Sequence, residues 1–201
     1  MLFYILEKDY KNTSFQEGFQ REDNCYLDWR RRNFGSYFQI LEDTNCGHFL
    51  PAFRKSSKRR QINAPKFYFF DIGIVNHLAR RGRIEPGSEL FGRAFEHFLF
   101  MELLAHTHYS RLRYPLNYWK TASGYEVDFI LGDNEIAVEA KASAAVQSGH
   151  LKGICAFKEE FRARRYIVVS LDAQPRKTPD GIEVLPWRSF CASLWSGELV
   201  K

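Results

Sequence analysis

The sequence lacks the features that would tie it to a membrane or to secretion. It contains no run of 18 or more apolar residues, so it predicts no membrane-spanning helix. Its apolar start at residues 1–6 has neither a preceding basic segment nor a small-residue cleavage site, so it does not read as a signal peptide. We therefore expect a cytoplasmic protein with no membrane partner.

Cysteine is scarce and widely spaced. The four cysteines form no Cys-x-x-Cys pair, which argues against a zinc site and against a disulfide framework. Reduced thiols are the simplest interpretation. The Gly-x-x-x-x-Gly-Lys-Ser/Thr pattern of phosphate-binding loops is missing as well, so the sequence predicts no ATP site.

The charge balance is only mildly basic, with a net charge of +5 and a pI near 9.0. Basic residues gather in the first half of the chain, at 30–32, 55–60 and 80–83. Such clusters are consistent with phosphate contacts. Solvated loops and helix ends explain them equally well, so charge alone does not decide between the two.

Apolar periodicity predicts one α/β domain with a mixed sheet flanked by helices. Its strongest element is a helix at 90–105, where apolar residues recur at helical spacing. A hairpin is predicted from two strands, 125–131 and 135–141, around the turn sequence Gly-Asp-Asn. The remaining elements are strands at 111–119, 165–171 and 181–185, and helices at 146–160 and 186–194.

The chain before this domain is less patterned. A short helix and a strand are predicted within 34–53, and a basic, flexible loop at 54–63. An aromatic strand at 66–71 ends where a short helix begins at Asp71-Ile72-Gly73. Residues 1–33 are expected to form an irregular arm.

The hairpin carries charges inside apolar strands. Side chains alternate between the two faces of a strand, so Asp128 is predicted to share a face with Glu126 and Ile130, and Val127 to lie on the opposite face. On the second strand, alternation puts Glu139 and Lys141 on one side, with Cα atoms about 6.5 Å apart.

Charges at such positions are costly unless they are paired or bind a metal. Asp128 and Glu139 could hold a hard divalent cation, Mg²⁺ or Mn²⁺, and Lys141 could orient a water molecule or stabilise negative charge on a phosphate. The alternative is an exposed hairpin face with a Glu–Lys pair that contributes a fraction of a kcal/mol, as surface pairs do.

The four charged positions resemble the core of PD-(D/E)XK nucleases. Asp128 is followed eleven residues later by Glu139-Ala140-Lys141, and the preceding helix carries Glu96. The resemblance implies a restriction-endonuclease-like fold, with Glu96, Asp128 and Glu139 as metal ligands and Lys141 as the residue that positions the nucleophile. Gln147, at the start of the next helix, is a weaker match.

A closer resemblance runs through six ordered segments from about residue 36 onward. They are similar to the C-terminal domain of unknown function in prokaryotic AAA-superfamily ATPases. The segments are Ser36–Thr44, Pro65–Gly73, Gly92 with Phe95-Glu96, Tyr118-Trp119-Lys120, Gly124–Phe129 and Val138–Ser143.

In that family an ATPase domain and a winged-helix-like segment precede the nuclease-like domain. This chain has no ATPase portion, so it resembles a C-terminal fragment, a split gene product or a truncated relative. The resemblance predicts a winged-helix-like remnant with the basic loop at 34–64 and a nuclease-like domain at 65–201. The irregular arm expected at 1–33 lies outside the resemblance.

Several other residues have two interpretations. Glu126 could be a further acidic ligand or an ordinary strand residue. Tyr118 and Trp119 could stack on bases, although core packing beside the hairpin is favoured. His106 and His108 could bind a metal, although a capping or surface role near a helix end is favoured.

Two functions follow as hypotheses. The first is metal-dependent hydrolysis of phosphodiester bonds in DNA or RNA. The second is a regulatory module without catalysis that binds nucleic acid, a separate ATPase or another protein. The charged site favours the first, and the missing ATPase portion favours the second.

Overall fold

The structure is a computed structural model that describes residues 37–200. These residues divide into two compact units. The first unit contains the described residues up to 49 together with Lys66–Asp71, and the second contains Leu50–Pro65 and the chain from Ile72 onward. The irregular arm predicted at 1–33 lies outside the described residues.

The first unit consists of a helix and a small sheet. Residues 37–43 are helical, and β1 (Gly47–Leu50) pairs with β2 (Lys66–Phe69). Aromatic rings hold these elements together, because the ring centroid of Phe67 lies 4.6 Å from that of Phe38. The short helix and the strand predicted within 34–53 are confirmed, as is the aromatic strand that follows.

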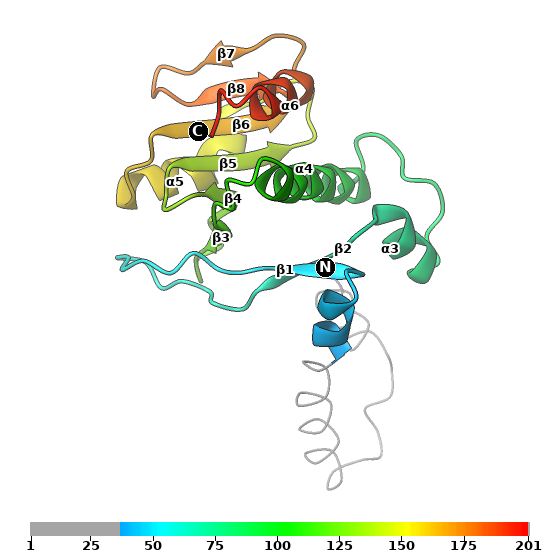
Figure 1. Cartoon of the computed structure of the whole chain (residues 1–201). Coiled ribbons are helices and arrows are strands. Elements are labelled where there is room, and N and C mark those ends of the chain that lie inside the picture. The colour runs from blue at the N-terminus through cyan, green and yellow to red at the C-terminus, as the bar shows by residue number, and fades with distance from the viewer. Residues whose placement is uncertain (1–36, 201) are drawn as a thin grey trace, which may run out of the picture. The chain divides into compact units, whose positions relative to one another are not determined.

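The second unit is built on a six-stranded mixed sheet with the strand order β3-β4-β5-β6-β8-β7 (Figure 1). Strand β4 runs antiparallel to both of its neighbours, β3 and β5, whereas β5, β6 and β8 run parallel. The predicted α/β fold with a mixed sheet is confirmed. The strands are β3 (Leu116–Lys120), β4 (Glu126–Leu131), β5 (Ile136–Lys141), β6 (Arg165–Ser170), β7 (Arg176–Lys177) and β8 (Glu183–Pro186).

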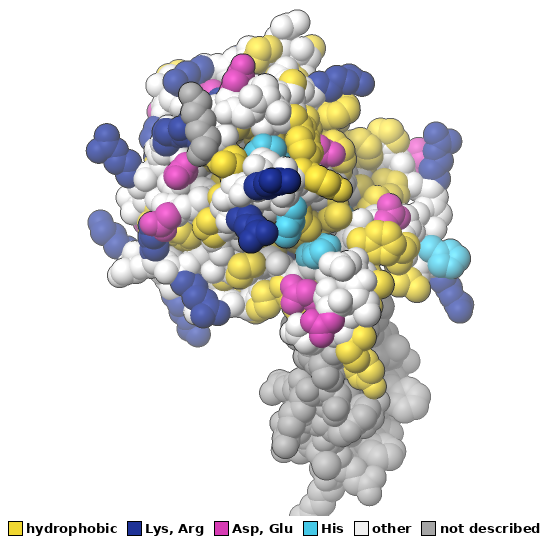
Figure 2. Space-filling view, in the orientation of Figure 1, with side chains coloured by type: hydrophobic (Ala, Val, Ile, Leu, Met, Phe, Trp, Pro, Cys, Tyr) yellow, Lys and Arg dark blue, Asp and Glu magenta, His cyan; other side chains and the backbone are white. Residues whose placement is uncertain are grey.

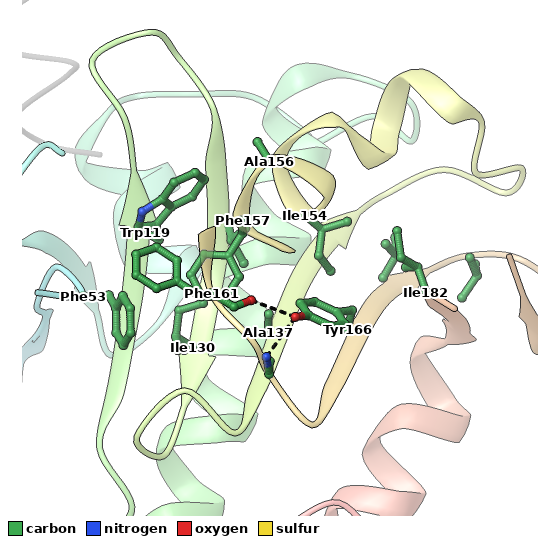
Figure 3. Close-up of a cluster of buried hydrophobic side chains, with 14 of the residues drawn as sticks. Phe53, Trp119, Ile130, Ala137, Ile154, Ala156, Phe157, Phe161, Tyr166 and Ile182 are labelled. Atoms are coloured by element: carbon green, nitrogen blue, oxygen red, sulfur yellow. Dashed lines mark hydrogen bonds between the residues drawn. The ribbon is translucent and has the colours of Figure 1, made fainter. Parts of the chain in front are cut away.

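Helices cover both faces of this sheet (Figure 1). On one face, Ile154 and Phe157 of α5 belong to the same buried cluster as Ile130 and Ala137 of the hairpin (Figure 3). On the opposite face, α4 stacks Phe100 against Phe129 and packs beside α6. The helical elements are α3 (Ile72–Leu78), α4 (Glu89–Tyr109), η1 (Ser148–Leu151), α5 (Lys152–Glu160) and α6 (Trp187–Trp195).

The long helix α4 confirms the strongest periodicity in the sequence. Ser88 caps its N-terminus by accepting a hydrogen bond from the backbone N–H of Phe91 at 3.1 Å. Leu99 and Leu103 of its apolar stripe are fully buried, whereas Phe98 is 37% exposed. The helix extends four residues beyond the predicted end at 105, to Tyr109.

Two predictions about strands are wrong. The strand predicted at 111–119 begins only at Leu116, because Arg111 and Arg113 have positive φ angles of 62° and 46° and Pro115 has no N–H to donate to a ladder. The two-residue strand β7 was not predicted, because Arg176 and its neighbour are too few to produce an alternating pattern.

The basic loop predicted at 54–63 lies along the outer edge of β3. The N–H of Ile62 donates to the carbonyl of Lys120 at 2.9 Å, so the loop pairs with the edge strand β3 and covers part of that edge of the sheet. Arg59 reaches across to α5 and forms an ion pair with Glu160 at 2.6 Å. At least part of the first-half basic charge is therefore paired within the protein.

Candidate functional site

The four predicted site residues come from three elements of the second unit. Glu96 lies on α4, Asp128 near the start of β4, and Glu139 and Lys141 at the end of β5. Because β4 and β5 are antiparallel, the start of one lies beside the end of the other. Oδ2 of Asp128 accepts a hydrogen bond from the backbone N–H of Ala140 at 2.8 Å, which fixes the aspartate against β5.

A β-bulge sets the direction of the side chains on β4. Asn117 of β3 pairs with Ile130, and Trp119 pairs with Val127, so two residues of β4 oppose one residue of β3 between these pairs. The strict alternation predicted for this strand is therefore wrong: Val127 and Ile130 both belong to the cluster packed against α5. The inserted pair includes Asp128, and bulges re-aim side chains in this way beside many active sites.

The predicted pairing of charges on β5 is confirmed. Nζ of Lys141 lies 2.6 Å from Oε1 of Glu139, so the two side chains share one face of the strand. Asp128 is 7% exposed and Glu139 is 4% exposed, which excludes the alternative of a solvated surface pair. The second carboxylate oxygen of Glu139, Oε2, is buried and has no hydrogen-bond partner within the part of the chain that the structure describes.

Burial and charge act strongly on this pair. Burial raises the pKa of Glu139 well above its ordinary value, the nearby negative charge of Asp128 raises it further, and Lys141 offsets only part of this. For Lys141, burial lowers the pKa, but the charges of Glu139 and Asp128 outweigh it and the pKa is raised overall. The charge of Glu96 makes a smaller contribution to that rise, so Glu96 lies near enough to act on Lys141.

Helix α5 closes one side of this site through a glycine. A Cβ atom at Gly153 would lie 2.0 Å from the backbone oxygen of Glu126 and 3.4 Å from Oε2 of Glu139. Only glycine therefore allows α5 to approach β4 this closely. The same glycine leaves room next to the unpaired oxygen.

The matches to protein families fall on this same unit and on the segment before it. Residues 91–190, which include all four candidate residues, match a family described as a domain of unknown function, DUF4143. This segment is similar to DUF4143 domains. Residues 17–85 match a second domain of unknown function, DUF8612. No curated protein and no solved structure matches the chain.

The DUF4143 match confirms the closer of the two resemblances, because domains of this family usually lie C-terminal to AAA ATPases. The match assigns no nuclease activity. No helix among residues 37–200 is long and apolar enough to cross a membrane.

Asp128 and Glu139 are buried carboxylates, and carboxylate oxygens are the kind of ligand that divalent cations such as Mg²⁺ bind. Among the described residues, no three His, Cys, Asp or Glu side chains are arranged to hold a metal ion by themselves. Mg²⁺ does not need three, because it commonly binds one or two carboxylates and keeps several water molecules. Oε2 of Glu139, which is buried and has no hydrogen-bond partner among residues 37–200, is an oxygen donor of the kind that such an ion binds.

Other candidate residues of the DUF4143-like segment have structural roles. Tyr118 and Trp119 are 2% and 1% exposed, so core packing is confirmed for both. His108 is exposed, as predicted, but a capping or surface role is wrong for His106, which is buried. Nδ1 of His106 lies 3.0 Å from the hydroxyl of Tyr114, because α4 turns this histidine into the core rather than out to solvent.

The structure adds residues to the site that sequence reasoning missed. Gly153 is one, and the only signal for it was a glycine in the middle of the helix predicted at 146–160. Lys120 is another, because its Nζ lies 2.6 Å from Oε2 of Glu126. The negative charge of Glu126 in turn raises the pKa of Glu139, so this second pair borders the first.

Proposed function

We propose that the DUF4143-like segment binds Mg²⁺ or Mn²⁺ and hydrolyses phosphodiester bonds in DNA or RNA on a restriction-endonuclease-like fold. The observation that supports this most is the buried carboxylate of Glu139, which has one oxygen paired with Lys141 and one without a partner among the described residues. A second carboxylate, Asp128, lies close enough to raise the pKa of the first. Two buried carboxylates repel each other, and a bound cation relieves that repulsion.

Each residue has a definite task in this proposal. Asp128 and Glu139 hold the metal ion, and Glu96 binds a second ion or a water ligand. A divalent cation supplies Lewis-acid stabilisation of charge on the phosphate and makes water more acidic. The backbone N–H of Ala140 keeps Asp128 in place, so the site is arranged before the ion arrives.

Lys141 serves as a cation and not as a base. The surrounding carboxylates raise the pKa of its ammonium group, so it stays protonated at neutral pH. It therefore donates hydrogen bonds to the attacking water or to the phosphate and stabilises the charge that develops there. Its side chain is 31% exposed, which leaves it accessible to a substrate.

The test combines metal binding with cleavage. Calorimetric titration with Mn²⁺ should show binding to the wild-type protein and a loss of at least about tenfold in affinity for Asp128→Asn and Glu139→Gln, by analogy with altered metal sites. Asp133→Asn is the matched control, because Asp133 lies in the hairpin turn and is 84% exposed. Single- and double-stranded DNA and RNA are then incubated with each protein and Mn²⁺. Folded wild-type protein that binds no Mn²⁺ and cuts no substrate would contradict the proposal.

A second function is supported by the family match. DUF4143 domains usually follow an AAA ATPase, so this unit could serve as a docking module that binds nucleic acid, a separate ATPase or another protein without catalysis. Metal-independent, salt-sensitive DNA binding that survives Asp128→Asn would favour this second function.

A further inference from the structure

The turn that joins β3 to β4 lies beside the candidate metal site and carries an exposed aromatic side chain. Tyr125 is 37% exposed and immediately precedes Glu126, whose charge acts on Glu139. Asp128 lies three positions further along the chain, a distance of about 10 Å at the usual rise of a strand. The tyrosine is therefore within reach of any extended ligand that occupies the metal site.

Hydrogen bonds fix this turn before a ligand binds. The N–H of Tyr125 donates to Oγ1 of Thr121 at 3.0 Å, and the N–H of Thr121 donates to the carbonyl of Tyr125 at 2.9 Å. Gly124 has a φ angle of 91°, which favours glycine. The turn is also joined to the basic loop, because the N–H of Ala122 donates to the carbonyl of Arg60 at 2.8 Å. Little conformational entropy remains to be lost when a ligand contacts such a turn.

The guanidinium group of Arg59 makes a cation–π contact with the ring of Tyr125. The guanidinium carbon of Arg59 lies 5.5 Å from the ring centroid. The two terminal nitrogens of Arg59 are held by Glu159 at 2.5 Å and Glu160 at 2.6 Å. The arginine and the ring therefore form a fixed stack in which an exposed part of the ring is open to a further flat group.

A second cation lies on the strand next to the tyrosine. Lys120 pairs across the strands with Glu126, and its side chain is 38% exposed. Its ammonium group adds positive charge at the same end of the sheet as Lys141. An exposed aromatic ring with cations around it, placed at a site for phosphodiester chemistry, matches the way proteins bind single strands: bases stack on rings and phosphates meet basic side chains.

We infer that Tyr125 and Lys120 bind an unpaired nucleotide of a single-stranded nucleic acid next to the metal site. The base stacks on the ring of Tyr125, and the adjacent phosphate contacts Lys120. A base inside a duplex has both faces covered by its neighbours, so this contact selects single strands, loops or frayed ends. The inference rests on the proposed function and specifies its substrate.

Binding to a labelled oligothymidylate, measured by fluorescence anisotropy in EDTA and in Ca²⁺, tests the inference. Tyr125→Ala should weaken binding by about 5- to 150-fold, the range for one stacked base, and Tyr125→Phe should keep most of the affinity. Lys120→Gln should reduce the salt dependence of binding by about one counterion. Tyr109→Ala is the matched control, because Tyr109 is 80% exposed at the far end of α4. Thermal unfolding of each variant establishes that it is folded.

Two results would overturn the inference. One is equal affinity of Tyr125→Ala and Tyr109→Ala for the oligothymidylate, and the other is wild-type affinity for a duplex that equals or exceeds that for the single strand. Neither result touches the proposed function, which depends on the Mn²⁺ titration of Asp128→Asn. Conversely, unchanged metal binding in Asp128→Asn would defeat the proposed function while leaving the contact with Tyr125 open to direct measurement.

Discussion

Replacing Gly153 by alanine introduces a methyl group where α5 lies closest to β4. The new Cβ atom would lie 2.0 Å from the backbone oxygen of Glu126 and 3.1 Å from its carbonyl carbon. Real Cβ atoms essentially never come closer than 3.0 Å to another heavy atom. The helix must therefore move by about 1 Å, because both partners in the contact are backbone and neither can rotate away.

The cost of this movement follows from core packing. Overpacking usually costs about 1–3 kcal/mol, and a contact between backbone groups belongs at the upper end of that range. Alanine also favours a helix over glycine by about 1 kcal/mol, which offsets part of the cost. We expect Gly153→Ala to lower the free energy of unfolding by about 2 kcal/mol. At Gly92, in α4, an added Cβ meets nothing within 4 Å, so Gly92→Ala should raise it by about 0.5–1 kcal/mol.

Urea unfolding of the two variants measures this difference directly. The expected separation between them is about 3 kcal/mol, with unchanged m-values if both unfold in two states. Because the added carbon also lies 3.4 Å from Oε2 of Glu139, Gly153→Ala should weaken Mn²⁺ binding while Gly92→Ala should not. Equal stability of the two variants would refute the close approach of α5 to β4 that underlies the site.

Two further perturbations test the core around the site. Burial lowers the pKa of His106, partly opposed by a hydrogen bond with the backbone of Leu194, so the unfolded chain binds a proton more readily than the folded one. The free energy of unfolding should therefore fall as pH drops below about 6.5 towards the pKa of His106 in the folded protein. His106→Gln should remove this dependence, whereas the exposed control His108→Gln should keep it. Identical pH profiles of the two variants would contradict the role given to His106. Tyr166→Phe should lower the free energy of unfolding by about 1–3 kcal/mol, as measured by urea unfolding. The reason is that the hydroxyl of Tyr166 accepts a hydrogen bond from the N–H of Ala163 at 2.9 Å and donates one to the carbonyl of Phe161 at 2.8 Å (Figure 3). An unchanged free energy of unfolding would refute this prediction.

The sequence predicted those parts of the fold whose pattern is local. The helix at 90–105 appears as α4 because its apolar stripe spans several turns and must be buried on one side. The hairpin of β4 and β5 appears because Gly132 and Asn134 adopt the positive φ angles, 66° and 71°, that its turn requires. Both signals depend only on residues near in sequence, so they are readable without tertiary information.

Features that depend on residues far apart in the sequence could not be predicted in this way. The bulge that includes Asp128 exists because two residues of β4 oppose one residue of β3, and a single strand read alone carries no sign of its partner's register. The ion pairs of Arg59 with Glu159 and Glu160 join residues about one hundred positions apart in the sequence. The predicted loop at 54–63 showed only its basic composition, and the acidic pair that neutralises part of it lies on α5.

The basic clusters illustrate why composition was a weak guide to a nucleic-acid interface. On the face seen in Figure 2, Lys and Arg side chains are spread out instead of forming one patch. Among the described residues, Lys55 pairs with Asp133 at 2.7 Å, and Arg59 is paired as well. Net charge therefore overstates the cations that a phosphate backbone could use, and the cations that matter for the proposal are the few beside the carboxylates.

The charged site also shows how the fold and the proposed function are linked. A hairpin that buries two carboxylates next to each other, with one oxygen of Glu139 unpaired, is less stable than one with apolar residues at those positions. Lys141 offsets only part of this, because it contacts one of the two oxygens of Glu139. Under the proposed function, a divalent cation held by Asp128 and Glu139 would supply the missing positive charge, so we expect added Mn²⁺ to stabilise the folded protein by an amount that grows with ion concentration. This stabilisation separates a metal site from a buried ion pair that serves the fold alone, because only the metal site gains stability from Mn²⁺ and loses that gain in Asp128→Asn.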